Sequence, residues 1–391
     1  MNEPSHVVIV GASLAGTRTA LALRREGYAG VLTIIGDEHH EPYDRPPLSK
    51  QVLQGKWGVD KATLLTPEAF TELNATWILG DGAVALDVGA RCVTLASGRV
   101  VQGDVIVIAT GTRARRLPFT ADRLLHTVRT SDDATTLARA LDVCMPGAVV
   151  AVIGAGFIGA EVATALKLRE LTPVVFESQP RPLDAILGST AATWLEQLPG
   201  DFGVTLHTGA SIADVRPDGV GVVLDTNSGV VSAALAVLGV GAVVNTEWLD
   251  GAGLALEHGV MVSSTLEAAP GIYAVGDVAR FPLRIAGDEG LVRIEHWQVA
   301  NDHASYVARH VVGLTREPFT TVPYFWSDQY GKKIQMLGHP SPTDDVRLVQ
   351  GSVGEGKWLA HYERRGVVTG VLALNNPREL MLSKPLLETT T

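Results

Sequence analysis

Two glycine-rich turns have the residue types and spacing to do chemistry. The first reads GASLAG at 11–16 and the second GAGFIG at 154–159, and each stands between an apolar run and a helical pattern. The first glycine of each motif permits a tight turn. The third residue, Ser13 or Gly156, is small, so backbone N–H groups can reach a pyrophosphate, and the last glycine lets helix and strand pack closely. Each helix N-terminus then faces the phosphates with its partial positive charge. The expected dinucleotide-binding residues are Gly11, Ser13, Gly16, Gly154, Gly156 and Gly159.

An acidic residue follows each turn by about 20 residues, as dinucleotide binding requires. VLTIIGDE places Asp37 and Glu38 after the next predicted strand of the first unit, and TPVVFES places Glu177 after that of the second. A carboxylate at this point accepts hydrogen bonds from ribose hydroxyls. One such turn alone is a weak indication, because a close-packed glycine turn can bind nothing. The same order of strand, turn, helix, strand and acid occurs twice, which favours two dinucleotide sites.

The similarity between the two units extends beyond their turns. Residues 93–111 and 222–241 both read as two strands around a Ser-Gly turn, followed by a buried strand that ends in glycine. This repeat predicts an α/β fold in which one Rossmann-like dinucleotide-binding domain is duplicated. Two such sites suit an enzyme in which a nicotinamide reduces a second, bound electron carrier.

The composition excludes several other classes of protein. The 391 residues include 32 Lys and Arg against 42 Asp and Glu, and this net charge of −10 argues against nucleic acid as a partner. We expect no membrane span, and the N-terminus lacks the basic region of a signal peptide. Cys92 and Cys144 form no CxxC pair and no metal-like spacing, and both read as small buried hydrophobic residues. We therefore expect a cytoplasmic protein with no metal site and no redox dithiol.

Five further segments resemble known families. ATG at 109–111 and IYAVGDVAR at 272–280 resemble the flavoprotein disulfide reductase superfamily, where these motifs accompany the FAD-binding turn. EPYDRPPLSK at 41–50, RIEHW at 293–297 and FWSDQYG at 325–331 resemble the ferredoxin reductases that include putidaredoxin reductase and the reductase components of aromatic-ring dioxygenases. The resemblance covers essentially the whole chain, in the family's order. It implies that FAD binds to the first unit and NADH to the second.

The resemblance also implies three domains. They are a discontinuous FAD-binding domain at 1–113 and 241–320, an inserted NAD-binding domain at 114–240, and a C-terminal α+β domain at 321–391. The sequence agrees at the second boundary, where GVGAVVNTEW leaves the duplicated unit.

Site residues are carried over from the resemblance one by one. At FAD we expect Ala15, Asp37, Arg45, Lys50, Val84, Arg129, Asp277 and Trp297. At the nicotinamide dinucleotide we expect Gly156, Ile158, Gly159, Glu177 and Gly241. Ser13 departs from the glycine often found at the middle of the first turn, but serine is small enough to leave the FAD assignment in place.

Three residues are expected to be catalytic. Lys50 is either a solvated lysine or a cation beside flavin N5, where negative charge develops on reduction, and its family position favours the second. Glu161 either sits favourably on the dipole of its helix or reaches across to pair with Lys50. Trp297 is either a core aromatic residue or a flavin contact, and its place in the segment RIEHW favours contact with the flavin. His296 and His303 receive no role, because hydride transfer from a nicotinamide to a flavin needs no protein base.

The predicted route of electrons follows from a missing cysteine. Disulfide reductases of the superfamily carry a redox cysteine pair after the first unit, and coenzyme A disulfide reductases and NADH oxidases carry one cysteine there, whereas this chain reads YDRPPLSK. Electrons must therefore leave the flavin directly. The resemblance implies an NADH:ferredoxin oxidoreductase whose iron–sulfur ferredoxin, of the [2Fe–2S] type, supplies a cytochrome P450 or a Rieske-type oxygenase. Alternatives are a reductase of rubredoxin or monodehydroascorbate, and a flavin-binding redox-signalling protein with low turnover.

Five basic residues are candidates for the face that docks an acidic ferredoxin. They are Arg113, Arg115, Arg116, Lys332 and Lys333. Such residues are also commonly part of an ordinary solvated surface, so the docking face remains one of two interpretations.

Overall fold

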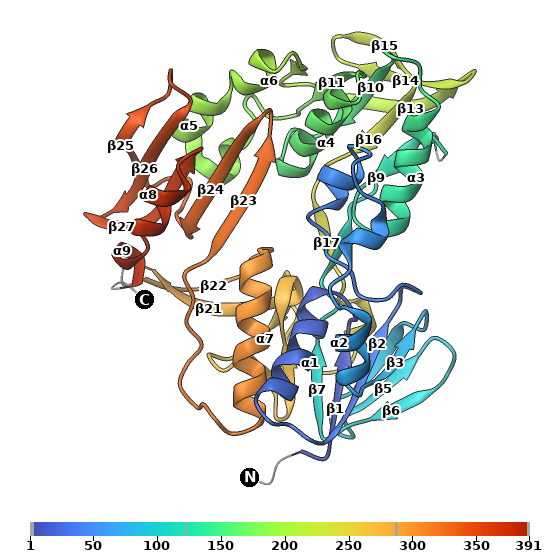
Figure 1. Cartoon of the computed structure of the whole chain (residues 1–391), viewed down its shortest axis with the longest axis vertical. Coiled ribbons are helices and arrows are strands. Elements are labelled where there is room, and N and C mark those ends of the chain that lie inside the picture. Colours follow the sequence, from blue (N-terminus) through green and yellow to red (C-terminus); the bar gives the residue numbers. More distant parts are fainter. Residues whose placement is uncertain (1–3, 122, 286–287, 389–391) are drawn as a thin grey trace.

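The first dinucleotide unit builds a six-stranded sheet in this computed structural model, which describes residues 4–121, 123–285 and 288–388 (Figure 1). In spatial order its strands are β19 (Glu267–Ala269), β20 (Ile272–Ala274), β7 (Val105–Ile108), β1 (His6–Val10), β2 (Val31–Gly36) and β3 (Thr76–Leu79). The strands from β20 to β3 run parallel. β1 and β7 are buried along nearly their whole length, which explains their uninterrupted apolar sequences.

Two helices from distant parts of the sequence pack side by side in this unit (Figure 1). They are α1 (Leu14–Arg25), which begins at the first glycine turn, and α7 (Trp297–Val311). Gly27 follows α1 with a φ of +93°, the left-handed conformation that commonly ends a helix. The unit also contains α2 (Pro67–Glu72) and two small sheets, which are β4 (Ala83–Asp87), β5 (Cys92–Leu95) and β6 (Val100–Gln102), and β18 (Val260–Met261), β21 (Ala279–Ile285) and β22 (Asp288–Val292).

The second unit repeats the arrangement of the first. Its parallel sheet has the order β12 (Thr205–His207), β11 (Thr172–Phe176), β10 (Val149–Ile153), β16 (Leu235–Leu238) and β9 (Leu125–Thr127). The strand before the glycine turn lies between the next strand and the return strand in both units, so the predicted duplication is confirmed. The other elements are α3 (Ser131–Asp142), α4 (Phe157–Leu168), α5 (Asp184–Leu195), α6 (Leu198–Asp201), β13 (Ile212–Asp218), β14 (Gly221–Thr226) and β15 (Gly229–Ala233).

A two-stranded antiparallel ribbon carries the chain between the two units. It consists of β8 (Thr112–Ala114) and β17 (Ala242–Val244). The boundaries expected at 113/114 and 240/241 lie within or beside this ribbon.

The C-terminal part is an antiparallel sheet with two short helices. In spatial order its strands are β23 (Tyr324–Gln329), β24 (Lys332–Gly338), β27 (Val367–Leu374), β26 (Lys357–Arg364) and β25 (Asp345–Ser352), followed in the chain by α8 (Pro377–Leu382) and α9 (Pro385–Glu388). This confirms the predicted fold class, two Rossmann-like domains and a C-terminal α+β domain. Figure 1 shows β23 and β24 extending toward α4 of the second unit. Among the described helices, none has both the length and the apolar character to cross a lipid bilayer.

Candidate functional site

The first glycine turn brings strand, turn and helix together at backbone distance. Gly11 has a φ of +122°, and a Cβ at this position would stand 2.2 Å from the carbonyl oxygen of Ala109. A Cβ on Gly16 would stand 1.9 Å from the carbonyl oxygen of Gly11. Ser13 is the N-cap of α1 but makes no side-chain capping bond, so the helix N-terminus is left to an anionic group. This turn fits the pyrophosphate of a dinucleotide.

The second turn is packed in the same way but is open where a ligand would approach. A Cβ on Gly154 would stand 2.4 Å from the carbonyl oxygen of Gly239, and a Cβ on Gly159 would stand 2.0 Å from that of Gly154. A Cβ on Gly156, in contrast, would meet nothing within 4 Å. The second turn therefore also fits a dinucleotide.

The acids that follow the two turns are not at equivalent positions. In the strand registers Glu177 corresponds to Gly36 rather than to Asp37. The Glu177 carboxylate accepts a hydrogen bond of 2.8 Å from the N–H of Ala155, within the second turn. A Cβ on Gly36 would stand 2.7 Å from that of Ala12, so there is little room for a side chain there and the first acid comes one residue later.

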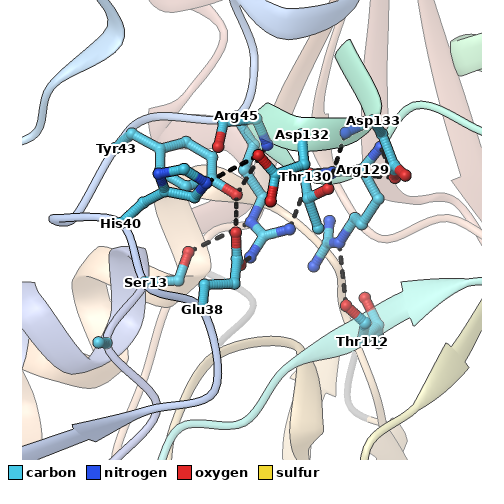
Figure 2. Close-up of polar contacts among 12 residues, drawn as sticks. Ser13, Glu38, His40, Tyr43, Arg45, Thr112, Arg129, Thr130, Asp132 and Asp133 are labelled. Carbon is cyan, nitrogen blue, oxygen red and sulfur yellow. Dashed lines mark hydrogen bonds and ion pairs between the residues drawn. The ribbon is translucent and has the colours of Figure 1, made fainter. Parts of the chain in front are cut away.

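A polar network surrounds Arg45 beside the first turn (Figure 2). Its guanidinium donates to Ser13 Oγ at 3.2 Å and to Glu38 Oε1 at 2.9 Å. It also donates to the carbonyl oxygen of Arg129 at 2.8 Å. The Tyr43 hydroxyl donates to the other oxygen of Glu38, and burial raises the pKa of Tyr43 to about 12, so the hydroxyl stays protonated. The network fixes one guanidinium against the turn that is expected to bind FAD.

Asp37 and Glu38 have different surroundings. Glu38 is held in the Arg45 network, whereas Asp37 is exposed after the end of β2. A Cβ on Gly82 would stand 3.1 Å from the Cβ of Asp37. Val84 follows two residues later and is 51% exposed on β4. Asp37 therefore lies beside the start of β4. The Glu38 side chain is the one held by Arg45 next to the first glycine turn.

The GD motif, Gly276 and Asp277, packs against the start of α1. Gly276 has a φ of +71°, and a Cβ there would stand 2.8 Å from the Cβ of Ala15. The neighbouring Asp277 pairs with the Arg129 guanidinium at 3.2 Å and accepts a hydrogen bond from the Thr112 hydroxyl at 3.2 Å. Burial lowers the pKa of Arg129. The structure thus brings together Ala15, Arg129 and Asp277, three of the residues expected at FAD.

Lys50 and Glu161 form a buried ion pair. Lys50 lies in a π-helical turn (Leu48–Val52), and its Nζ is 2.8 Å from Glu161 Oε2. Lys50 is 9% and Glu161 4% exposed. Glu161 is the fifth residue of α4, beyond the first turn where a helix dipole acts. Of the two interpretations of Glu161, the structure shows the one in which its carboxylate pairs with Lys50.

Trp297 begins α7 and lies against the segment that contains Lys50. Its Nε1 donates to Asp44 Oδ1 at 2.9 Å, and burial raises the pKa of Asp44. The ring of Trp326 on β23 is edge-on to it, with centroids 6.3 Å apart. Trp297 is therefore held between the first unit and the C-terminal sheet.

The remaining residues expected at the second site border its turn. Ile158 is 45% exposed in the first turn of α4. Gly241 has a φ of +91° between β16 and β17, and a Cβ there would meet nothing within 4 Å. Both positions leave space beside the glycine turn for a ligand.

The two histidines near the GD motif are poor proton donors or acceptors at neutral pH. Burial lowers the pKa of His296 to about 4 and that of His303 to about 3, so both are neutral. His303 Nδ1 accepts a hydrogen bond from the N–H of Gly276, which gives this residue a structural task.

One expectation from the sequence needs correction, and the docking residues stay a prediction. Cys92 and Cys144 are unpaired but half-buried, because each lies near the end of a peripheral element rather than in the core. Of the five candidate docking residues, Arg113 pairs with Glu247 at 2.6 Å and Lys333 with Asp328 at 3.7 Å. Acidic neighbours thus already balance two of the five charges.

Some residues that the structure places at the site were not singled out from the sequence. Ser49 and Ser327 both donate to Glu161, and Asp44 holds Trp297. All three belong to the segments PYDRPPLSK and FWSDQYG, so position within these segments was a usable signal. In the described part of the chain, no group of three or more His, Cys, Asp or Glu side chains is placed to hold a metal ion.

Two dinucleotide turns with a buried Lys–Glu pair between the units define a two-cofactor oxidoreductase. The chain belongs to the pyridine nucleotide-disulphide oxidoreductase family, whose sequence profile matches residues 5–304. Residues 324–391 match a reductase C-terminal domain. The protein is accordingly a flavoprotein oxidoreductase.

Similar proteins match along nearly the whole chain. Rhodocoxin reductase of Rhodococcus erythropolis is 34% identical over 98% of this chain and 89% of its own length. The ferredoxin reductase component of chlorobenzene dioxygenase from a Cupriavidus species is 33% identical, over 98% and 92%. The crystal structure of the covalent putidaredoxin reductase–putidaredoxin complex matches with a TM-score of 0.92 and 29% identity, covering 100% of this chain and 94% of that one.

Proposed function

We propose that this protein is an FAD-dependent NADH:ferredoxin oxidoreductase. The observation that carries the proposal is the segment 41–50. Where disulfide reductases of the superfamily carry redox cysteines, this segment has none and instead supplies Lys50 to the buried pair with Glu161. Since this segment holds no cysteine relay, electrons that enter from NADH would pass from a flavin bound beside Lys50 directly to the acceptor.

Bound FAD supplies the chemistry that links a hydride donor to a one-electron acceptor. The residues that would hold it are Gly11, Ser13, Ala15, Gly16, Asp37, Arg45, Lys50, Val84, Arg129, Asp277 and Trp297. The residues that hold NADH are Gly154, Gly156, Ile158, Gly159, Glu177 and Gly241. The Lys50 ammonium, oriented by Glu161, stabilises negative charge where it develops on reduction.

The acceptor is an iron–sulfur ferredoxin of the [2Fe–2S] type that supplies a cytochrome P450 or a Rieske-type oxygenase. Two relatives support this acceptor: one is named rhodocoxin reductase, and the other is named the ferredoxin reductase component of chlorobenzene dioxygenase. The two unpaired cysteines agree with a reducing compartment, and we place the enzyme in the cytoplasm.

Acceptor choice tests this proposal. Purified protein with FAD and NADH should reduce cytochrome c rapidly only when a [2Fe–2S] ferredoxin is added. Rubredoxin or monodehydroascorbate should substitute poorly. Turnover that is equally fast with either of these acceptors, or negligible with every acceptor, would replace the proposal by one of its alternatives.

Coenzyme choice gives a further prediction at Glu177. Its carboxylate stands where the 2′-phosphate of NADPH would lie and should repel it. Arg181 is engaged by Glu196 at 3.0 Å and by Asp184 at 3.7 Å, so its charge is already balanced. We expect kcat/KM to be at least about 10-fold higher for NADH than for NADPH, since like charges in contact disfavour binding.

A matched pair of variants isolates this effect. Glu177→Gln keeps an oxygen that can accept the N–H of Ala155 but removes the charge, so the preference for NADH should fall by about 10-fold. Asp37→Asn, in the first unit, should leave coenzyme preference unchanged. Steady-state kinetics with both coenzymes measure this. Wild-type kcat/KM for NADPH equal to or above that for NADH would refute the role of Glu177.

A further inference from the structure

The Glu161 carboxylate receives hydrogen bonds from two sides. Lys50 Nζ and Ser49 Oγ donate to its Oε2 at 2.8 and 2.6 Å, and both come from the first unit. Ser327 Oγ donates to Oε1 at 2.7 Å, and the N–H of Asp328 lies at 3.3 Å from the same oxygen. Glu161 itself belongs to the second unit, so three parts of the chain meet at one carboxylate.

Ser327 is placed so that its proton goes to Glu161. It lies on β23 and is 1% exposed. Gln329 Nε2 donates to the Ser327 oxygen at 3.3 Å, so the hydroxyl proton is left for Glu161 Oε1 at 2.7 Å. The N–H of Tyr330 donates to Thr164 Oγ1 at 2.7 Å. Ser327 and Asp328 of β23 therefore hold Glu161 of α4, and Tyr330, directly after β23, donates to Thr164 three residues further along the helix.

The Ser327 hydroxyl makes the shorter of the two hydrogen bonds that reach Oε1 of Glu161 from β23. The last side-chain torsion of glutamate has a broad energy profile, so donors on one oxygen alone do not define the plane of the carboxylate. Lys50 and Ser49 donate to Oε2, and β23 donates to Oε1 from the Ser327 hydroxyl at 2.7 Å and from the N–H of Asp328 at 3.3 Å. A carboxylate held at both oxygens also fixes the direction of the Lys50 ammonium that it pairs with.

We propose that Ser327 is a positioning residue, through which the C-terminal domain sets the orientation of the Lys50–Glu161 pair and thereby the rate of flavin reduction. This inference rests on the proposed function, in which the Lys50 ammonium acts on the flavin. It gives the C-terminal domain a part in the first half of the reaction, the entry of electrons from NADH.

The test compares Ser327→Ala with Thr164→Val. Ser327→Ala removes the shorter of the two bonds to Glu161 Oε1 and leaves only the longer one from the N–H of Asp328. The reduction of bound FAD by NADH should then slow by about 10-fold at unchanged FAD content, because the buried carboxylate loses a donor that fixes its plane. The midpoint potential of the bound FAD should also fall, since the reduced flavin is less well stabilised. Thr164→Val removes the bond that α4 accepts from Tyr330, directly after β23, without touching Glu161, and both quantities should stay at the wild-type value.

A second variant covers the case in which Ser327→Ala does not fold. Ser327→Cys keeps nearly the same volume but donates weakly, so it should also slow reduction and lower the potential. If folded Ser327 variants match Thr164→Val in rate and in potential, β23 only packs on α4 and the inference is overturned. If NADH does not reduce the FAD of the wild-type protein, the proposed function fails instead, and the two failures are distinguishable.

Discussion

Replacing Lys50 with methionine is expected to slow the reduction of bound FAD by NADH by up to about 100-fold, the size of effect seen when a preorganised charge-stabilising group is removed. Lys50 is buried against Glu161, and methionine keeps much of its length without its charge. FAD should remain bound, since the Arg45 and Arg129 networks and the first turn are untouched. Anaerobic stopped-flow absorbance with NADH in excess measures the rate.

Stability must be separated from rate in this experiment. Lys50→Met leaves the Glu161 charge buried without a cation, and breaking a buried pair costs about 3–5 kcal/mol of unfolding free energy. The double variant Lys50→Met/Glu161→Gln removes both charges, so it should recover stability while staying slow. Traces that overlay those of the wild type would reduce the pair to a structural ion pair between the two units.

Alanine at Gly159 is expected to damage the second domain severely. The new Cβ would stand 2.0 Å from the carbonyl oxygen of Gly154, where neither backbone segment can yield without moving β10 or α4. Such overpacking costs about 3 kcal/mol, a large share of the stability of a domain. Urea unfolding followed by circular dichroism should show a lower midpoint, and reduction by NADH should be lost.

Gly156 in the same turn is the matched control. Its φ is −69°, and a Cβ would meet nothing within 4 Å, so Gly156→Ala should leave the unfolding midpoint unchanged. The methyl group would occupy the space left for the pyrophosphate, so KM for NADH should rise. Equal loss of stability in both variants would contradict the close packing described for this turn, and an unchanged KM would place the dinucleotide elsewhere.

The strands and turns of this fold were readable because their rules are local. Continuous apolar runs identify parallel strands buried on both faces, and the glycines at 11 and 154 require positive φ. The C-terminal domain was predicted from the family resemblance, because a pattern of alternating strands does not show which sheet each strand joins.

The site was readable only where pairs of residues are close in sequence. The residues themselves could not decide between the two interpretations of Glu161, because Lys50, the partner that the resemblance offered, lies 111 residues away and only the packing of the two units brings them together. Ser327 lies 166 residues beyond Glu161, and only its place in the segment FWSDQYG was a signal for it. The choice between Asp37 and Glu38 depended on Arg45, which binds Glu38 and leaves Asp37 exposed, and periodicity does not report such a contact.

In the proposed reaction, electrons pass from NADH through FAD to an iron–sulfur protein without a cysteine relay. The most direct test is anaerobic double-mixing stopped flow on the wild type and on Cys92→Ser/Cys144→Ser. NADH first reduces the FAD, and oxidised putidaredoxin, used as a probe [2Fe–2S] protein, is then added. We expect flavin reoxidation to coincide with reduction of the iron–sulfur protein, at the same rate in the wild type and in the cysteine-free variant. Reoxidation that is abolished in the cysteine-free variant, or flavin that stays reduced in the presence of the iron–sulfur protein, would contradict it.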